Sequence, residues 1–401
     1  MNRKPPLNHF LTKMKKIYFD HNATTPVAPE VKEAMGPFLD DKFGNPSSVH
    51  QAGREARQSV EWARQQAASL INASPSEIVF TSGGSEGDNM AVKGVLFNYL
   101  KQGGHIITTL VEHPAVLETF SYMEKFFGFE ATYLGVDGYG MVDPDALKKA
   151  IRKDTVLISI MAANNETGNI FPVKEMAEMA RERGIIFHTD AVQVTGKMPV
   201  DVKELGVDLL TASGHKFNAP KGVGFQYVKS GIKVPPVLIT GGHQEHGFRA
   251  GTGNVPGIAA LGKACEMATG PMDGKAKTIG ALRDRLEQGI LENIPETVLN
   301  GHRENRIYNT SNISFKYVEA EAILQMLDMK GIAVSTGSAC SSETSEPSHV
   351  LQAMGLPPMC SRGAIRFSLG MGNTEEDVDY CLEVLGPIVD RLQKMSPLFP
   401  A

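Results

Sequence analysis

The chain has 401 residues, 42% of them hydrophobic and 21% charged, and its 40 basic against 45 acidic residues give a formal net charge of −5. This composition is typical of a folded globular protein and excludes a generally basic nucleic-acid binder. Four cysteines without a Cys-x-x-Cys pair exclude a disulfide-rich scaffold and a structural zinc site. No run of about 18 apolar residues occurs, so we expect no membrane span.

From residue 76 to residue 228, short apolar runs alternate with longer amphipathic stretches. The expected strands are 78–80, 105–110, 155–161, 185–190 and 209–210, and the expected helices are 87–100, 115–127 and 173–183. Strands that alternate with helices favour parallel pairing through right-handed crossovers. The predicted fold class is therefore α/β, with a mainly parallel sheet covered by helices on both faces.

After residue 270 the pattern changes to that of a smaller α+β domain. Helices are expected at 275–290, 319–329 and 374–394, apolar segments at 313–315 and 365–369, and a small-residue stretch at 335–342. We predict three regions: a basic N-terminal extension at 1–17, disordered rather than organelle-targeting, a large domain at 18–268, and a small C-terminal domain at 269–401.

Polar residues directly follow five of the predicted strands. They include Ser85, His113, Asn165, Asp190 and Lys216. Ligands of open α/β sheets bind at the carboxyl ends of the strands, so these side chains predict a ligand site there. The Gly83–Ser85 turn suits a phosphate cradle at a helix N-terminus.

Two interpretations of this site stay open on these residues alone. Gly83, Ser85 and Gly87 also match the nucleophile elbow of α/β-hydrolases, and Asp190 and His215 follow in the order of a serine triad. A serine hydrolase that uses Ser85 is therefore an alternative. Against this, a lysine in a constrained turn, as Lys216 is, can form a Schiff base when its pKa is lowered.

Three further residues carry expectations of their own. Asp190 ends an apolar strand and needs a cationic partner, such as a cofactor ring nitrogen, an arginine or a histidine. Arg366 lies in an apolar run and needs an anion, either a substrate carboxylate or a buried acid. Cys340 lies among small residues and is expected to be an exposed, reactive thiol, whereas Cys265 and Cys381 belong in the core and Cys360 is partly exposed.

Taken together, these motifs resemble the cysteine desulfurases of the NifS/IscS type, which belong to the class V aminotransferase group of enzymes that use pyridoxal 5'-phosphate (PLP). The resemblance runs from Tyr18 to Leu385, and its anchors include Tyr18–Pro26, Thr81–Asn89, Asp190–Gln193, Ser213–Lys216, Arg249–Gly253, Gly337–Ser341 and Ala364–Ser368. It implies the PLP-dependent transferase type I fold, with a seven-stranded sheet in the large domain. Ser85 stands where such proteins commonly have threonine.

The resemblance implies a role for each matching residue. Lys216 would hold PLP through a Schiff base, His113 would stack on its ring, and Asp190 would pair with its pyridinium nitrogen. Gln193 would contact the ring hydroxyl. The implied phosphate ligands are Gly84, Ser85, Ser213 and His215, with Thr252 reaching in from the second subunit of a homodimer. The implied substrate residues are Asn22, Asn165 and Arg366, and Cys340 would accept the sulfur as a persulfide.

The implied function is conversion of L-cysteine to L-alanine, with the sulfur passed from Cys340 to an acceptor, expected to be an iron–sulfur scaffold protein. A selenocysteine lyase and a sulfur donor for tRNA thiolation share this cofactor and stay open as alternatives. We expect a cytoplasmic homodimer that contacts neither nucleic acid nor membrane. We expect no stable metal site, although Cys340 could briefly ligate a nascent iron–sulfur cluster.

Overall fold

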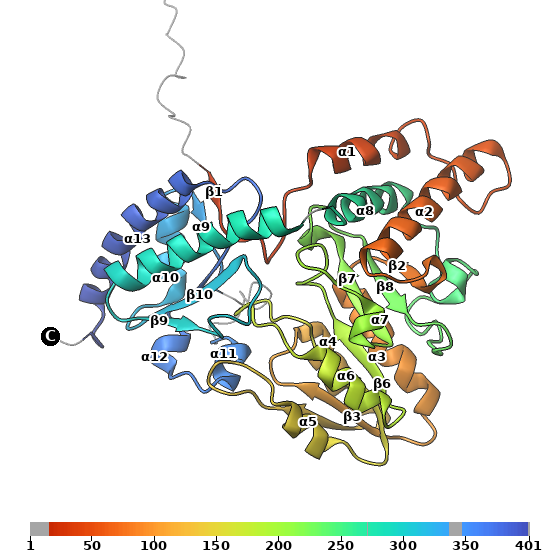
Figure 1. Cartoon of the computed structure of the whole chain (residues 1–401), viewed down its shortest axis with the longest axis horizontal. Coiled ribbons are helices and arrows are strands. Elements are labelled where there is room, and N and C mark those ends of the chain that lie inside the picture. Colours follow the sequence, from red (N-terminus) through yellow and green to blue (C-terminus); the bar gives the residue numbers. More distant parts are fainter. Residues whose placement is uncertain (1–15, 271, 337–346, 400–401) are drawn as a thin grey trace, which may run out of the picture.

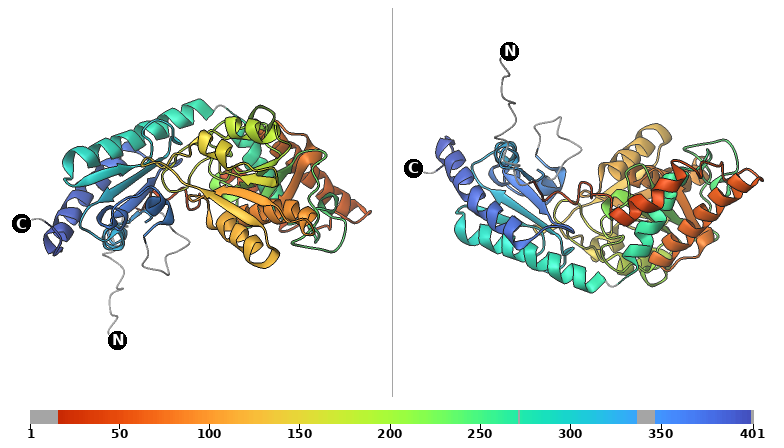
Figure 2. Two further views of the ribbon diagram at one scale, coloured as in Figure 1. Left: turned by 90° about the horizontal axis from the view of Figure 1, so that it is seen from below. Right: turned by 90° about the horizontal axis from the view of Figure 1, so that it is seen from above.

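The computed structural model describes residues 16–270, 272–336 and 347–399, and these form two lobes. The larger lobe, at the right of Figure 1, contains a seven-stranded sheet, and the smaller lobe contains a three-stranded sheet. Figure 2 shows the two lobes side by side from two further directions. The predicted extension, residues 1–17, lies mostly outside the described residues, which begin at residue 16.

The large sheet has the strand order β2-β8-β7-β6-β5-β3-β4. Its strands are β2 (Ile78–Thr81), β3 (His105–Thr109), β4 (Glu130–Leu134), β5 (Thr155–Ser159), β6 (Ile186–Asp190), β7 (Leu209–Ser213) and β8 (Gly224–Val228). Strand β8 pairs antiparallel with both β2 and β7, and the other pairs are parallel. The predicted α/β class with a mainly parallel seven-stranded sheet is confirmed.

Helices cover both faces of this sheet, which is why its strands are apolar on both sides. Val79 packs in one core cluster, whereas its neighbours Ile78 and Phe80 pack in the other. One face is covered by α3 (Gly84–Leu96) and α4 (Pro114–Phe127). The opposite face is covered by α2 (Gln51–Leu70), α6 (Val173–Arg181) and α8 (Val255–Ala268). The short helices α1 (Pro29–Met35), α5 (Pro144–Ala150) and α7 (Val202–Leu205) complete this lobe.

The smaller lobe has its own core. Its antiparallel sheet has the order β12-β10-β9, formed by β9 (Thr297–Asn300), β10 (Thr310–Phe315) and β12 (Ala364–Ser368). Its helices are α9 (Met272–Asn293), α10 (Ala320–Asp328), α11 (His349–Ala353), α12 (Pro358–Ser361) and α13 (Glu375–Met395). Leu286, Phe315 and Leu385 lie fully buried between the sheet and the long helices.

The N-terminal strand belongs to this second core. Strand β1 (Ile17–Tyr18) pairs in parallel with β11 (Ile332–Ala333), and Ile17 and Phe19 are buried in the same cluster as Phe315. The chain therefore starts in the smaller lobe, crosses to the larger one, and returns through α9. The division of the chain at residue 268 stays a prediction, but Ile17 is not part of a disordered extension, because it is paired in β1 and packed.

Three cysteines lie in the described chain. Cys265 and Cys381 are fully buried, as predicted, and burial raises the pKa of the Cys381 thiol to about 12. The expectation for Cys360 was wrong: it is 7% exposed, because α12 turns its side chain into the smaller lobe. None of the described helices is long and apolar enough to cross a membrane.

Candidate active site

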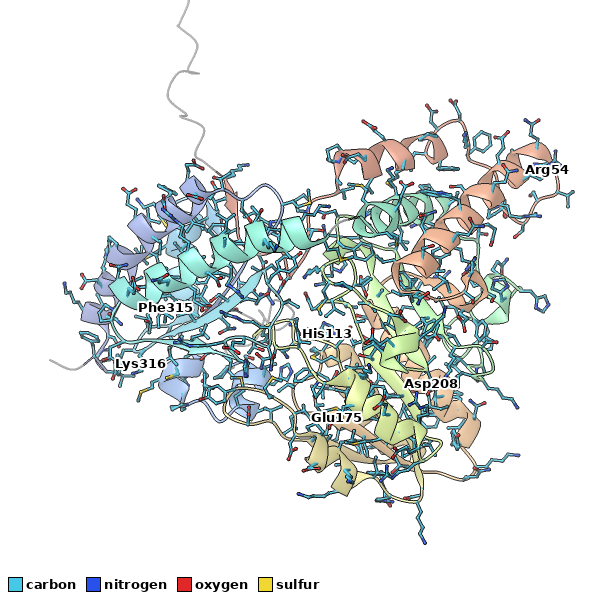
Figure 3. The ribbon with its side chains drawn as sticks, viewed as in Figure 1. Arg54, His113, Glu175, Asp208, Phe315 and Lys316 are labelled. Atoms are coloured by element: carbon cyan, nitrogen blue, oxygen red, sulfur yellow. The ribbon has the colours of Figure 1, made fainter. Side chains whose placement is uncertain are left out.

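Adjacent strands of the large sheet bring three of the predicted residues together. Asp190 is the last residue of β6, which pairs in parallel with β7, and Ser213 is the last residue of β7. Lys216 follows in a single 3-10 turn, Gly214–Lys216. Figure 3 shows His113 on the larger lobe, near its junction with the smaller one. The carboxyl ends of the strands therefore face the junction between the lobes.

Lys216 is half-buried and reaches toward the N-terminal segment. Its Nζ donates hydrogen bonds to the backbone carbonyl oxygens of Asn22, at 2.6 Å, and Ala23, at 2.9 Å. That segment is tied to the same turn, because the Thr25 amide and hydroxyl both donate to the His215 carbonyl oxygen. The turn that carries Lys216 is thus fixed against a segment that links the two lobes.

Asp190 is a buried acid at the end of a buried strand. Its Oδ1 accepts a hydrogen bond from the Val192 amide at 2.9 Å. Burial raises the pKa of Asp190 to about 6, although the Val192 hydrogen bond and the charge of Lys216 act in the opposite direction. A buried carboxylate of this kind is stabilised by any cation that enters the site.

A group of buried acids and a histidine surrounds Asp190. Burial raises the pKa of Glu112 to about 8, and burial together with the charge of Asp190 raises the pKa of Asp88 well above its usual range. Burial lowers the pKa of His188 to about 3, and its Nε2 lies 3.7 Å from Asp88 Oδ1. With a pKa of about 6, against about 8 for Glu112, Asp190 ionises more readily at neutral pH than Glu112.

His113 caps helix α4 and presents a neutral ring. Its Nδ1 accepts a hydrogen bond from the Ala115 amide at 3.1 Å, and Pro114 occupies the first helical position. Burial and the nearby charges of Lys216 and His349 lower the pKa of His113 to about 4. Because Nδ1 is an acceptor, the ring proton is on Nε2. A neutral imidazole of this kind can lie flat against an aromatic ring.

The turn before α3 provides an anion cradle. Gly83 has φ +151°, a conformation that side chains rarely adopt, and a Cβ at Gly84 would lie 3.0 Å from Val192 Cγ2. No side chain caps the start of this helix, so its first N–H groups face the site, where anions bind favourably. Ser85 is exposed in the first turn, and Ser213 Oγ would lie 3.4 Å from a Cβ at Gly83.

His215, the fourth predicted phosphate ligand, lies beside the N-terminal segment. Its Nδ1 lies 3.1 Å from Thr24 Oγ1. Burial and the charges of nearby lysines, Lys216 first among them, lower the pKa of His215 to about 4. The proposed triad of Ser85, Asp190 and His215 is not formed, because His215 bonds to Thr24 and Asp190 to the Val192 amide. The serine hydrolase alternative is therefore wrong.

The predicted substrate residues come from both lobes. Arg366 lies in β12 and is 1% exposed. It donates from Nη1 to the Asn165 carbonyl oxygen at 2.9 Å and from Nη2 to Asp20 Oδ1 at 2.8 Å. Asn22 donates from Nδ2 to the same Asn165 oxygen at 3.2 Å. These residues meet on the side of the site formed by the smaller lobe.

Asp20 was missed in the sequence analysis, although it carries a signal. It is an acid directly after the apolar Ile17–Phe19 run, and such a residue needs a cation. Its partner, Arg366, is 346 residues away in sequence, so only the fold identifies the pair. Two predicted residues are not tested. Cys340 lies outside the described residues, and Thr252 is exposed in the loop before α8, where its predicted role concerns a second subunit.

Comparison with known proteins agrees with this architecture: a doubly covered, mainly parallel sheet with a lysine and an aspartate at the ends of two adjacent strands and a histidine after a third strand of the same sheet. The family model for aminotransferase class-V matches residues 17–381. The chain is 53% identical over 389 residues to a protein of Methanosarcina thermophila named cysteine desulfurase IscS, covering 97% of this chain and 96% of that one. The chain belongs to the class-V aminotransferase family and, within it, to the cysteine desulfurases.

Solved structures give the same result. A NifS-like protein superposes with a TM-score of 0.89 at 40% identity, covering 94% of this chain and 100% of that chain. A structure described as SspA in complex with cysteine superposes with a TM-score of 0.80 at 37% identity, covering 88% of this chain and 99% of that one. The resemblance inferred from the motifs is confirmed.

Proposed function

We propose that this protein is a PLP-dependent cysteine desulfurase that converts L-cysteine to L-alanine and leaves the sulfur on Cys340 as a persulfide. The observation that carries the proposal is the placement of Asp190 and Lys216 at the ends of the adjacent strands β6 and β7, with His113, after β3, close enough for the charge of Lys216 to lower its pKa. Membership of the cysteine desulfurases supports the choice of reaction, and the relative solved with cysteine supports the choice of substrate.

The residues present fit PLP. The buried Asp190 carboxylate suits a protonated ring nitrogen, and the neutral His113 ring suits stacking on a pyridine. The uncapped start of α3 behind Gly83 and Gly84 suits a phosphate, with hydroxyls nearby from Ser85 and Ser213. Lys216 has an amine that can condense with an aldehyde. When bound, PLP supplies an electron sink for negative charge that develops next to the substrate amine.

Each side chain around the bound PLP would then have its own role. Asp190, charged at neutral pH, would keep the ring nitrogen protonated, because loss of that proton would leave the carboxylate buried without a partner. Lys216, once released by the incoming substrate amine, would move the proton at the substrate α-carbon. Arg366 and Asn165 would hold the substrate carboxylate, with Asp20 fixing the guanidinium.

The transfer of sulfur to Cys340 requires no added oxidant. The Cys340 thiolate attacks the substrate sulfur, the carbon–sulfur bond breaks, and its electron pair stays on the organic fragment, which takes up protons to become alanine. The sulfur leaves as a persulfide on Cys340, at the oxidation level of a disulfide. The assignment of this step to Cys340 comes from the sequence resemblance.

Several features of the proposal come from the family alone. A homodimer with Thr252 in the partner's phosphate site, and an iron–sulfur scaffold protein as sulfur acceptor, are what the resemblance in sequence implies. Transfer to tRNA thiolation or activity on selenocysteine uses the same site. A cytoplasmic location stays a prediction.

The test is alanine release from L-cysteine by purified protein with a thiol reductant, alongside visible absorbance of the bound cofactor. The Lys216→Ala variant is expected to lose both the absorbance band and alanine formation. The Cys340→Ala variant is expected to keep the band and lose desulfuration. Lys221→Ala and Cys360→Ala, which lie outside the proposed site, are the matched controls. A wild type with neither band nor alanine would contradict the proposal.

A further inference from the structure

A second lysine is buried behind the proposed active site. Lys197 is 7% exposed and lies in the turn after β6, four residues beyond Gln193. The preceding Gly196 has φ +76°, and a Cβ there would lie 2.6 Å from Phe217, directly beside Lys216. The backbone therefore holds Lys197 against the turn that carries Lys216.

The Lys197 amine has two partners, and both are side-chain amides. Its Nζ donates to Gln193 Oε1 at 2.9 Å and to Asn22 Oδ1 at 3.2 Å. Within the described residues, no carboxylate pairs with it. The charges that face it are those of Lys216 and Arg366, and together with burial they hold its pKa well below the usual range. Nothing in this arrangement stabilises the fold through charge pairing.

These two hydrogen bonds determine which way the amides point. Because Nζ donates to both, the two amide oxygens face it and the two amide nitrogens face away. The other contacts agree: Gln193 Nε2 donates to the Asn22 carbonyl oxygen at 3.2 Å, and Asn22 Nδ2 donates to Thr310 Oγ1 at 2.8 Å. The Lys197 amine thus orients Gln193, on the proposed cofactor side, and shares the orientation of Asn22, on the proposed substrate side, with Asn309, whose Nδ2 also donates to Asn22 Oδ1 at 3.1 Å.

We infer that Lys197 is a positioning residue that holds the amides of Gln193 and Asn22 in their binding orientation, and so couples cofactor binding to substrate binding. The inference rests on the proposed function, in which Gln193 presents an N–H to the cofactor ring oxygen and Asn22 lines the substrate pocket. Without Lys197 the Gln193 amide could rotate and present its oxygen instead, which would repel an oxygen of the ligand, and the Asn22 oxygen would lose one of its two donors.

The test replaces Lys197 with methionine, which has a similar length and no donor. The dissociation constant for PLP, measured by titrating cofactor-free protein, is expected to rise about tenfold, as for loss of one buried hydrogen bond. The KM for L-cysteine is expected to rise while kcat changes less. The melting temperature is not expected to fall, since methionine removes a buried amine that pairs with no carboxylate of the described residues. Lys203→Met is the matched control, because Lys203 donates to Asn72 Oδ1 on the exposed surface.

Two more variants separate positioning from packing. Lys197→Gln keeps an N–H donor and is expected to recover part of the lost cofactor affinity. Gln193→Ala combined with Lys197→Met should bind PLP no more weakly than Gln193→Ala alone, because the lysine acts through that amide. A methionine variant that unfolds, additive losses in the double variant, or wild-type cofactor affinity and KM in the methionine variant would each overturn the inference. A wild type that neither binds PLP nor forms alanine would overturn the proposed function as well.

Discussion

The two sides of the site are built differently. On the cofactor side, Asp190, Gln193, Ser213 and Lys216 come from the ends of two neighbouring strands within 27 residues of sequence. On the substrate side, Asp20 and Arg366 are 346 residues apart and meet through one ion pair in the smaller lobe. The first group is positioned by the register of the sheet, and the second by the return of the chain across both lobes.

The geometry of the two sides is therefore fixed by different parts of the fold. The cofactor side inherits its rigidity from a sheet that is packed on both faces, so its geometry depends on the core of one lobe. The substrate side depends on how the N-terminal segment and β12 are held together, through the bridge between Asp20 and Ser368. Substitutions on the two sides should therefore change different kinetic quantities.

The largest effect is expected on the cofactor side, at Asp190. Asp190→Asn removes the charge that would hold the ring nitrogen protonated, and kcat for alanine formation is expected to fall by about two to three orders of magnitude. The KM should change much less, because the substrate residues are untouched. Asp208→Asn, which affects an acid paired with Lys229 at the edge of the same strands, is the control. Retention of wild-type kcat in Asp190→Asn would exclude the proposed role of Asp190.

Substitutions on the substrate side should change the KM for L-cysteine more than they change kcat. Arg366→Lys removes the planar fork that joins Asp20 and Asn165, and the KM for L-cysteine is expected to rise roughly 10- to 100-fold. Asp20→Asn should give a smaller rise in the same quantity. Arg285→Lys is the matched control in the same lobe, since Arg285 makes a two-point contact with the exposed Asp379. An equal fall of kcat in both site variants would remove the distinction between the two sides.

The same difference explains what could be predicted from the sequence. Asp190 and Lys216 were identified because each directly follows an apolar strand, and the parallel arrangement places such residues at one edge. Asp20 and Lys197 were not, because their partners are set by contacts between distant segments or by burial that the local sequence does not reveal. Strand β4 was missed because it is a short, partly exposed strand at the edge of the sheet and lacks a continuous apolar run.

A smaller effect is expected in the pH dependence of stability, through His113. Its pKa is about 4 in the folded protein, against about 6.5 for a free histidine. The unfolded chain therefore binds the proton first as the pH falls, and stability that is present above pH 6.5 is lost on the way to pH 4. Between pH 6.5 and 5.0 this loss is about 1.5 kcal/mol.

The measurement is urea unfolding of cofactor-free protein at these two pH values. His113→Asn keeps the helix cap and should lose about 1.5 kcal/mol less than wild type over this interval. His243→Asn, at an exposed position, is the control and should behave as wild type. The result concerns the cofactor side, because the charge of Lys216 contributes to the lowered pKa of His113. Identical losses in wild type and His113→Asn would show that the ring is not held neutral there.

The smallest effect is expected at Ser85, on the edge of the cofactor side. The first N–H groups of α3 and the conformation of Gly83 remain in Ser85→Ala, so only one hydroxyl contact to the phosphate is lost. The dissociation constant for PLP is expected to rise about fivefold. Ser85→Thr, which keeps the hydroxyl, should stay close to wild type, and Ser69→Ala, at an exposed position of α2, is the control. With saturating cofactor, alanine formation by Ser85→Ala should be nearly unchanged, because a residue that binds phosphate does not take part in the chemical step. Abolished turnover at saturating cofactor would instead indicate that Ser85 takes part in the chemical step as a nucleophile, and would contradict its role as a phosphate ligand.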